Sequence, residues 1–142
     1  MKYAYLALLA FVCACGTYEK TTIKMPDGFS VRAEIADTPQ KAEKGLMFRD
    51  ALDDDKGMIF TFDKEDKRIF WMKNTYVNLD IIFITADKKI SAIWEYVPRS
   101  YKNTPEENVA LAAGYAKYVL ELPAGTARKQ NLKEGDTLTF NL

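Results

Sequence analysis

The stretch from residue 68 to residue 84 limits most strongly what this chain can fold into. It holds two runs rich in β-branched and aromatic residues on either side of a short polar turn, which is typical of two strands of a sheet. One carboxylate, Asp80, lies in the second run among aliphatic residues that a globular protein buries. Burying a carboxylate is costly unless it is paired or accepts several hydrogen bonds. The pattern therefore predicts cationic partners for Asp80, and the candidates are Arg49 and Lys73.

A second carboxylate, Glu121, lies between two leucines in a later strand-like run. If the two strands meet, Asp80 and Glu121 converge with Arg49 and Lys73 in a half-buried polar pocket beside Trp71. Two alternatives stay open, since structural ion pairs perturb their surroundings much as active sites do. In the first, the charges are ion pairs that fix the strand register; in the second, Glu121 points to solvent from a one-sided strand.

Composition excludes several classes of protein. The chain has 142 residues, 48% of them hydrophobic, which suits one domain with its own core. Twenty basic residues balance twenty acidic ones, so the basic surface of a nucleic-acid binder is not expected. There is no histidine, and no cysteine follows Cys15, which excludes histidine-based triads and thiolate nucleophiles in the domain.

The first residues are typical of an export signal. Lys2 precedes an apolar stretch, residues 3–12, that is too short to span a bilayer as a helix. The residues that follow, Val-Cys-Ala-Cys-Gly, resemble a bacterial lipoprotein signal in which Cys15, rather than Cys13, is lipidated. The alternative is ordinary cleavage of the signal. We expect a signal at 1–14, a tether at 15–22 and a single domain at 23–142, held to a bacterial membrane on the periplasmic side or cell surface through Cys15.

The pattern along the domain is mostly that of strands. Turn residues and alternation predict strand pairs at 23–25 with 29–35, 58–62 with 69–73 across a charged loop at 63–67, and 79–85 with 90–97. Further expected elements are a helix from Pro39 to about Lys44, a long connection at 98–114, a strand at 118–122, a short helix at 124–132 and a strand at 136–142. The fold class is mainly β (β-rich α+β). We expect a compact antiparallel sandwich or barrel-like domain of about seven to eight strands with one or two short helices.

Five motifs along the chain closely resemble a known family. They are Gly45-Leu46-Met47-Phe48-Arg49, Gly57-Met58-Ile59-Phe60, Phe70-Trp71-Met72-Lys73-Asn74-Thr75 with Leu79-Asp80-Ile81-Ile82-Phe83-Ile84, Val119-Leu120-Glu121-Leu122-Pro123-Ala124-Gly125, and Gly135-Asp136. In this order they resemble the domain of unknown function 192 family from about Phe29 onward. The resemblance implies a compact β-rich domain, usually exported or membrane-anchored, and no established activity. It also implies that eight residues matter: Arg49, Trp71, Met72, Lys73, Asn74, Thr75, Asp80 and Glu121.

Three functions compete on these residues. The first is a binding or accessory module of the cell envelope, in which Trp71 with polar neighbours takes a glycan, a peptide or a protein partner. The second is a hydrolase of envelope polysaccharide that uses Asp80 and Glu121 as a carboxylate pair. The third is a reduced-copper site on the thioethers of Met47, Met58 and Met72. We expect a binding protein rather than an enzyme, with no cofactor and no nucleic-acid partner.

Overall fold

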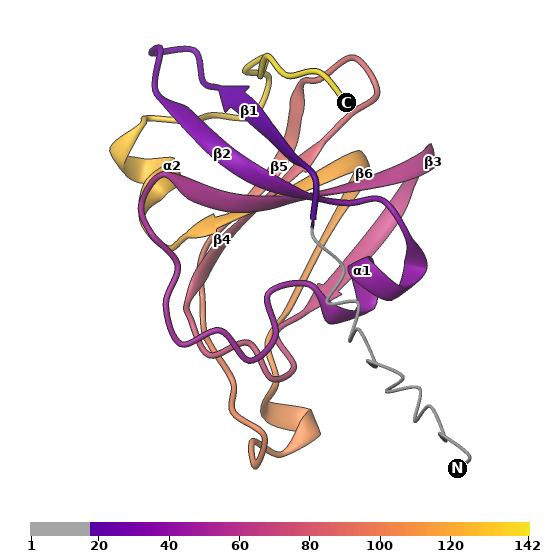
Figure 1. The fold of residues 1–142 in the computed structure, drawn as a ribbon, viewed down its shortest axis with the longest axis vertical. Coiled ribbons are helices and arrows are strands. Elements are labelled where there is room, and N and C mark those ends of the chain that lie inside the picture. The colour runs from indigo at the N-terminus through magenta and orange to yellow at the C-terminus, as the bar shows by residue number, and fades with distance from the viewer. Residues whose placement is uncertain (1–17) are drawn as a thin grey trace, which may run out of the picture.

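One mixed sheet of six strands forms the frame of the domain in the computed structural model, which describes residues 18–142 (Figure 1). The strands are β1 (Lys20–Lys24), β2 (Ser30–Ala36), β3 (Lys56–Trp71), β4 (Leu79–Ile84), β5 (Ile90–Val97) and β6 (Leu111–Pro123), in the spatial order β1-β2-β3-β6-β4-β5. The helices are α1 (Pro39–Lys44), α2 (Thr126–Lys129) and the 3-10 turn η1 (Glu106–Asn108). The expected export signal and Cys15 lie outside the described residues.

The β-rich fold class is confirmed, whereas its finer description was wrong. The described residues form six strands in one sheet that is not closed into a barrel, rather than seven or eight in a sandwich or barrel. The sheet is also not purely antiparallel, because β2 and β3 run parallel. Parallel neighbours need a crossover connection, and the segment that holds α1 supplies it.

The expected hairpin and α1 both form, but β1 begins at Lys20, so residues 20–22 of the expected tether belong to the strand. Thr38 precedes α1 and accepts a hydrogen bond from the Lys41 N–H at 3.2 Å, which satisfies one of the unpaired donors of the first turn. Pro39 occupies the first helical position, where its missing N–H leaves no bond unmade. Gly45 ends the helix with φ of 45°. The segment after Gly45 then turns back toward the sheet.

The expected pair of strands at 58–62 and 69–73 is wrong. Both runs belong to the single strand β3, and both pair with β6. The register between β3 and β6 shifts between Thr61 and Asp66, so the strand bends there without ending. The charged residues 63–67, expected as a loop, form the bent middle of β3.

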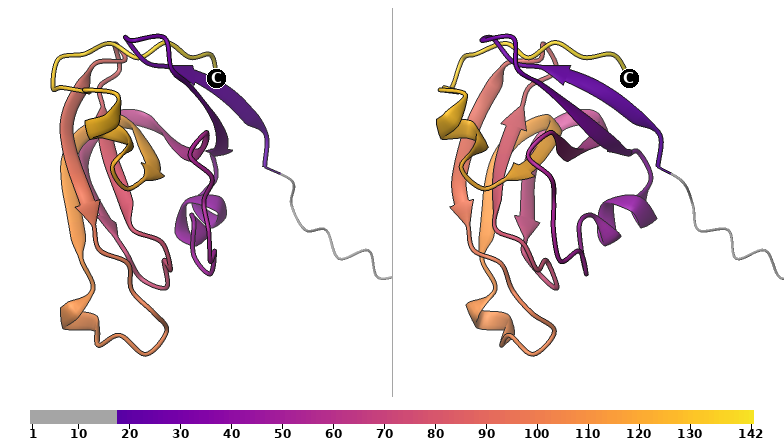
Figure 2. Two further views of the ribbon diagram at one scale, coloured as in Figure 1. Left: turned by 90° about the vertical axis from the view of Figure 1, so that its left-hand side faces the viewer. Right: turned by 60° about the vertical axis from the view of Figure 1, so that its left-hand side comes forward.

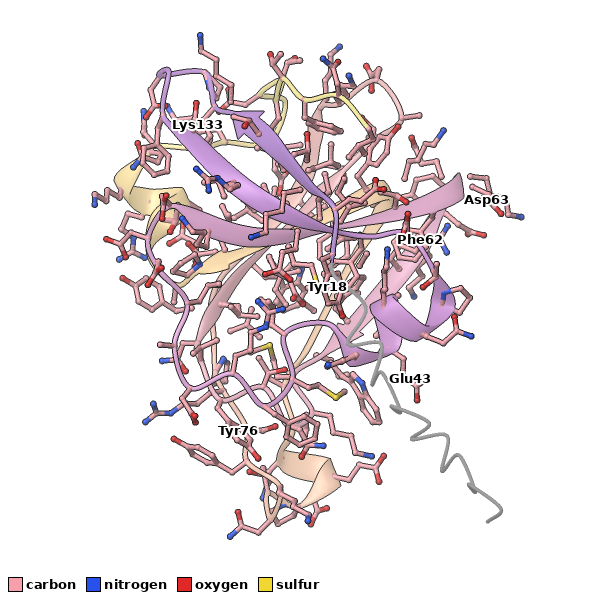
Figure 3. The ribbon with its side chains drawn as sticks, viewed as in Figure 1. Tyr18, Glu43, Phe62, Asp63, Tyr76 and Lys133 are labelled. Atoms are coloured by element: carbon pink, nitrogen blue, oxygen red, sulfur yellow. The ribbon has the colours of Figure 1, made fainter. Side chains whose placement is uncertain are left out.

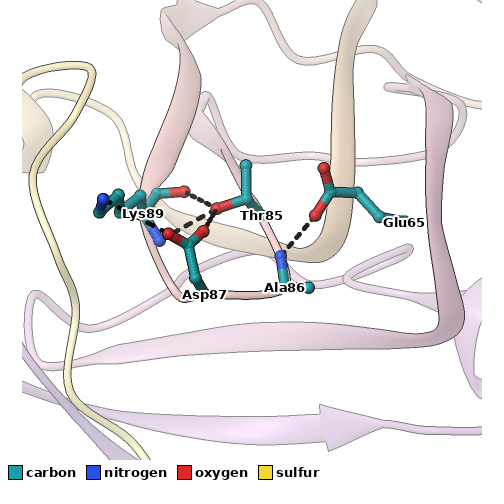
Figure 4. A network of polar contacts seen from close by, with 5 residues as sticks. All are labelled: Glu65, Thr85, Ala86, Asp87 and Lys89. Atoms are coloured by element: carbon teal, nitrogen blue, oxygen red, sulfur yellow. Dashed lines mark hydrogen bonds and ion pairs between the residues drawn. The ribbon is translucent and has the colours of Figure 1, made fainter.

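The bend of β3 is fastened to the turn between β4 and β5 (Figure 4). The Glu65 carboxylate accepts a hydrogen bond from the Ala86 N–H at 2.6 Å. In the same turn the Thr85 hydroxyl accepts from the Lys89 N–H at 3.2 Å and donates to the Asp87 carboxylate. A charged residue can therefore lie in strand conformation here because the neighbouring turn supplies its partner, which sequence spacing alone does not show.

The C-terminal part departs from expectation at two places. Strand β6 begins at Leu111, so the connection expected over 98–114 is shorter and the strand expected at 118–122 is longer. The strand expected at 136–142 does not form, and this segment makes only isolated bridges with Lys24 of β1 and with Lys89, just before β5. Its alternation still reflects burial, because Leu138 and Phe140 are 1% and 2% exposed.

Two apolar clusters cover the two faces of the central strands. One contains Ile23, Val31, Ile59, Ile82, Leu120 and Leu122 with the C-terminal segment, and the other contains Leu46, Met58, Phe60, Ile81, Phe83 and Val119. Figure 2 shows α1 and α2 on opposite sides of the strands, and each packs on a different cluster. All six residues of β4 are buried. Within residues 18–142, no helix has the length and apolar character needed to cross a membrane.

Candidate functional site

The two carboxylates that the sequence singled out lie on opposite faces of the sheet. Across β4 and β6, Asp80 is the partner of Leu122 and Ile81 is the partner of Glu121. Partners in an antiparallel ladder share a face and neighbours along a strand alternate, so Asp80 and Glu121 point to different sides. The predicted convergence of the two carboxyl groups is wrong. A hydrolase that needs both on one bond does not fit this register.

Asp80 is held by backbone groups rather than by cations. It is 0% exposed, and its two carboxylate oxygens accept hydrogen bonds from the Tyr96 N–H at 2.9 Å and the Ala127 N–H at 2.8 Å. Tyr96 lies in an irregular part of β5 with φ of 53°, and Ala127 lies in α2. In residues 18–142, Asp80 forms no ion pair, so the predicted cationic partners are wrong. Asp80 fastens β5 and α2 to β4.

Glu121 is buried without such partners. Its side chain belongs to a residue that is 6% exposed, and no hydrogen bond or ion pair to its carboxyl group forms within the described part of the chain. Burial raises the pKa of Glu121 to about 8, and the charge of Arg49 partly offsets this rise. At neutral pH the carboxyl group is therefore mostly protonated, unlike an ordinary surface glutamate.

Arg49 lies close enough to act on Glu121 through its charge, but its hydrogen bonds go to Glu34. Its guanidinium donates two hydrogen bonds to the Glu34 carboxylate at 2.9 and 2.7 Å. This bond holds the pKa of Glu34 below its usual range and raises the pKa of Arg49. Glu34, Met58, Glu121 and Ile81 are successive partners across β2, β3, β6 and β4. The row thus holds one paired and one unpaired carboxyl group.

Glu121 opens into a hollow of about 220 Å³, called here the Glu121 hollow. Its wall is largely aromatic and aliphatic, which is typical of sites for small ligands. The lining residues are Ala42, Glu43, Lys44, Gly45, Leu46, Met47, Phe60, Phe62, Ile69, Phe70, Trp71, Thr75 and Glu121. Figure 3 labels two of them, Glu43 on α1 and Phe62 on β3. The hollow therefore lies between α1 with the segment after it and the strands β3 and β6.

A second hollow of about 370 Å³, called here the outer hollow, shares four of these residues. It is lined by Gln40, Glu43, Lys44, Met47, Phe48, Trp71, Lys73 and Asn74. The Lys73 ammonium lies 4.6 Å from the centre of the Trp71 ring, a cation–π contact. Trp71 and Met47 thus stand between the two hollows.

The edge of the outer hollow carries unusual backbone conformations. Phe48 has φ of 64° and Asn74 has φ of 53°, values that a bulky aromatic residue rarely adopts. The Phe48 N–H donates to the Asn74 carbonyl at 2.8 Å and joins the two loops. Ser100 holds the Asn74 loop from behind, since its N–H donates to the Thr75 carbonyl at 2.9 Å and its hydroxyl donates to the Met72 carbonyl. Conformations of this kind gather at functional sites, where the surroundings enforce them.

The structure therefore brings together five of the eight residues that the resemblance singled out, and places three elsewhere. Trp71, Lys73, Asn74, Thr75 and Glu121 line the two hollows. Arg49 pairs with Glu34 beside Glu121, Asp80 fastens the opposite face, and Met72 is buried in the apolar cluster. The sequence reasoning missed Gly45, Leu46 and Phe48 and the phenylalanines of β3 as residues of the site. The motif from Gly45 to Arg49 contained that signal, but only Arg49 and, as a copper ligand, Met47 were taken up from it.

The three methionines proposed for reduced copper do not share one environment. Met58 and Met72 are 0% and 1% exposed and belong to the apolar cluster, whereas Met47 lines both hollows. Met58 and Met72 therefore serve as core residues. Over residues 18–142, no group of three His, Cys, Asp or Glu side chains lies in an arrangement suited to a metal ion.

Comparisons with known proteins place this domain in a family. A search of the curated proteins gave no match. Among solved structures, a Sinorhizobium meliloti 1021 protein described provisionally as a transcription regulator is 33% identical, with a TM-score of 0.74 over 87% of this chain and 95% of that chain. A protein of unknown function from Novosphingobium aromaticivorans DSM 12444 is 34% identical, with a TM-score of 0.70 over 86% of this chain and 84% of that chain. The family model DUF192 (Uncharacterized ACR, COG1430) matches residues 21–140, so the chain belongs to this family of uncharacterised proteins.

Proposed function

We propose that this protein is a lipid-anchored binding module of the cell envelope, and that the Glu121 hollow is where its ligand binds. The observation that carries the proposal is Glu121 itself: a residue that is 6% exposed, whose carboxyl group is unpaired within the described residues and lies in the wall of a hollow lined by aromatic, aliphatic and a few charged side chains. Such a group destabilises the fold, so its presence calls for a reason other than stability. We take that reason to be the binding of a ligand.

The surroundings of Glu121 support binding rather than catalysis. Catalysis by a carboxyl group needs a second acid, base or nucleophile within reach, and Asp80 faces the other side of the sheet. Glu34 is the other acid of the row, two strands from Glu121, but Arg49 holds its carboxylate in two hydrogen bonds. Glu43 also lines the hollow, but it is an exposed residue of α1. A buried acid among aromatic and aliphatic side chains is an arrangement that orients a ligand.

The provisional description of the Sinorhizobium relative does not favour DNA binding by this chain. Twenty basic and twenty acidic residues give a net charge of zero, and binding to DNA depends on neutralising phosphates with lysine and arginine. Any regulatory role of this domain would therefore pass through a ligand or a protein partner rather than through direct contact with DNA.

The two tryptophans allow a direct test of where a ligand binds. The two side chains are similarly exposed, at 42% for Trp71 and 43% for Trp94. Trp71 lines both hollows, whereas Trp94 lines neither, and its indole N–H donates to the Ala113 carbonyl. The variant W94F keeps only Trp71 as the indole fluorophore, and W71F keeps only Trp94. Peptidoglycan fragments, oligosaccharides, peptides and small amphiphiles are titrated into both.

We expect a true ligand to change the fluorescence of W94F and leave that of W71F unchanged. Equal changes in both variants, or a ligand that binds E121Q as tightly as the wild type in every case, would place the binding site elsewhere. Absence of any response across the panel would count against the module itself.

The proposed lipidation and membrane location are tested separately on the full-length chain in a bacterial host. Cys15 and Cys13 are two positions apart, so C15S and C13S form a matched pair. We expect C15S to lose incorporation of labelled palmitate and to leave the membrane fraction, because acyl chains on one residue supply the anchor. The variant C13S should behave as the wild type. Membrane retention of C15S would contradict lipidation at this cysteine.

A further inference from the structure

Resting on the proposed function, we propose that the part of the ligand that reaches Glu121 is a protonated amine carried on an apolar or aromatic body. Glu121 then acts as the carboxylate partner of that ammonium group. The inference depends on which charges face Glu121 and on what the wall of the hollow offers to each kind of ligand.

Within residues 18–142, no lysine or arginine forms an ion pair or a hydrogen bond with the Glu121 carboxyl group, including the exposed Lys44 in the lining of the hollow. Arg49 is the positive group that acts on Glu121 from the segment after α1, and its guanidinium donates two hydrogen bonds to Glu34 on β2. On α1, Glu43 and Lys44 line the hollow without an ion pair to Glu121 in residues 18–142. After β3, Lys73 stacks on Trp71 at the outer hollow. The place of a counter-ion beside Glu121 is therefore left to a ligand.

The wall of the hollow also favours a cation. Phe60, Phe62, Phe70 and Trp71 all line it, and the faces of aromatic rings attract positive charge. Two of these rings already hold cations of the protein, because Arg68 lies 4.0 Å from the centre of the Phe62 ring and Lys73 lies over Trp71. The aromatic wall thus accepts cations where the structure provides them, and Glu121 adds the negative charge at depth.

A neutral or anionic ligand uses this arrangement less well. A neutral hydroxyl gains one ordinary hydrogen bond with protonated Glu121, which is weaker than a bond between an ammonium and a carboxylate. Because the pKa of Glu121 is about 8, the free energy needed to ionise it at pH 7 reduces the apparent affinity for a cation by only about tenfold. An anionic ligand would keep Glu121 protonated and gain nothing from the aromatic faces.

The binding step has a proton balance that can be measured. An amine enters as its ammonium ion, Glu121 loses its carboxyl proton to the solvent, and the ammonium donates hydrogen bonds to the carboxylate that forms. Near pH 7 about one proton is therefore released for each ammonium bound. A ligand that binds to the protonated acid releases none.

The test uses benzylamine, benzyl alcohol and benzoate, which share one ring and differ in charge, with the full-length chain and calorimetry in two buffers of different ionisation enthalpy. We expect benzylamine to bind at least about tenfold more tightly than the other two at pH 8, with proton release at pH 7. Its affinity should rise about tenfold per pH unit below the pKa of Glu121 and level off above it. N-acetyl-lysine methylamide, run beside benzylamine, distinguishes a lysine side chain from a free amine as the source of the ammonium.

Variants separate this inference from the proposed function. E121Q should remove the preference for benzylamine and the proton release while benzyl alcohol still binds, whereas E107Q, which changes an exposed acid of η1 outside both hollows, should keep both. If benzyl alcohol or benzoate binds the wild type as tightly as benzylamine, with no proton release, the ammonium inference is wrong and the binding module stands. If none of the probes changes the fluorescence of W94F at millimolar concentration, both are wrong.

Discussion

Asp80 and Glu121 begin from the same sequence signal and end in opposite physical situations. Each is an acid in a strand of aliphatic residues, and the structure buries both, at 0% and 6% exposure. Asp80 accepts two backbone hydrogen bonds that join three elements, whereas Glu121 has no such partner in residues 18–142 and lies in the wall of a hollow. Burial of a charge therefore does not identify a site by itself. The hydrogen-bond partners of the buried acid decide whether it stabilises the fold or is a candidate for binding a ligand.

The largest expected contrast is in stability at neutral pH. Asp80→Asn should lower the free energy of unfolding by about 4 kcal/mol, because the amide NH₂ faces a backbone N–H and leaves a buried donor unpaired. Glu121→Gln removes a group that has no partner to lose, so its free energy of unfolding should stay equal to that of the wild type or rise. Urea unfolding of both variants at pH 7 measures the difference. Equal losses would mean that Glu121 also has a stabilising partner.

The next contrast is in pH dependence. The pKa of Glu121 is about 8 in the folded protein against an ordinary value of 4.5, so between these values the folded chain binds more protons than the unfolded chain. Its contribution to stability is thus complete below the lower value and is lost as the pH rises. The free energy of unfolding should fall by roughly 1.4 kcal/mol per pH unit, or on the order of 3 kcal/mol between pH 5 and pH 7.5.

Subtracting the curve of Glu121→Gln isolates this contribution, because the other titrating groups are common to both proteins. The difference between the two curves should narrow toward pH 5 and widen toward pH 8. A constant difference across this range would show that the pKa of Glu121 in the folded protein is ordinary.

Local patterns in the sequence were enough for several of the elements, and they singled out these two acids as anomalies. Alternation predicted the β1–β2 and β4–β5 hairpins, and Thr38 with Pro39 predicted the start of α1. The faces of Asp80 and Glu121 were not predictable, because they depend on the register between β4 and β6. A shift of one residue would have put both carboxyl groups on one side.

The site was predictable to the extent that it lies in contiguous motifs. Trp71, Lys73, Asn74 and Thr75 follow one another along the chain, so one resemblance found them together. The aromatic wall comes from the two halves of β3, which the charged middle of the strand made look like separate elements. The strand continues because both halves pair with β6 and because Glu65 bonds to the Ala86 N–H, and both are contacts between distant segments.

A third contrast concerns the anchor of Asp80 at α2. Gly125 precedes this helix with φ of 91°, and a Cβ there would lie 2.5 Å from the Tyr96 hydroxyl oxygen. Gly125→Ala should therefore lower the free energy of unfolding by about 2 kcal/mol, from backbone strain and from displacement of the Tyr96 ring. Gly135→Ala is the matched control, since Gly135 also has φ of 91° but open space around it.

Urea unfolding should show a loss of about 1 kcal/mol for Gly135→Ala, which represents the backbone strain alone. The excess for Gly125→Ala then measures how tightly the Tyr96 region is held against α2 around Asp80. Identical losses in the two variants would mean that Tyr96 moves aside without cost and that this anchor is loose.

The smallest expected change in stability concerns Arg49, the residue whose charge acts on Glu121. Arg49→Met removes a half-buried ion pair with Glu34 and should lower the free energy of unfolding by only about 1 kcal/mol, because both side chains keep contact with solvent.

Arg49 also lowers the pKa of Glu121, so the same variant should raise that pKa above its value of about 8. NMR titration of the ¹³C-labelled Glu121 carboxyl group measures this change. Lys41→Met is the control, since it removes a cation that pairs with Asp37 on the surface and should leave the Glu121 titration unchanged. If Arg49→Met lowers the pKa of Glu121 or leaves it unchanged, the charge that partly stabilises the Glu121 carboxylate comes from another residue. The description of Glu121 as an acid influenced by Arg49 but not paired with it would then be wrong.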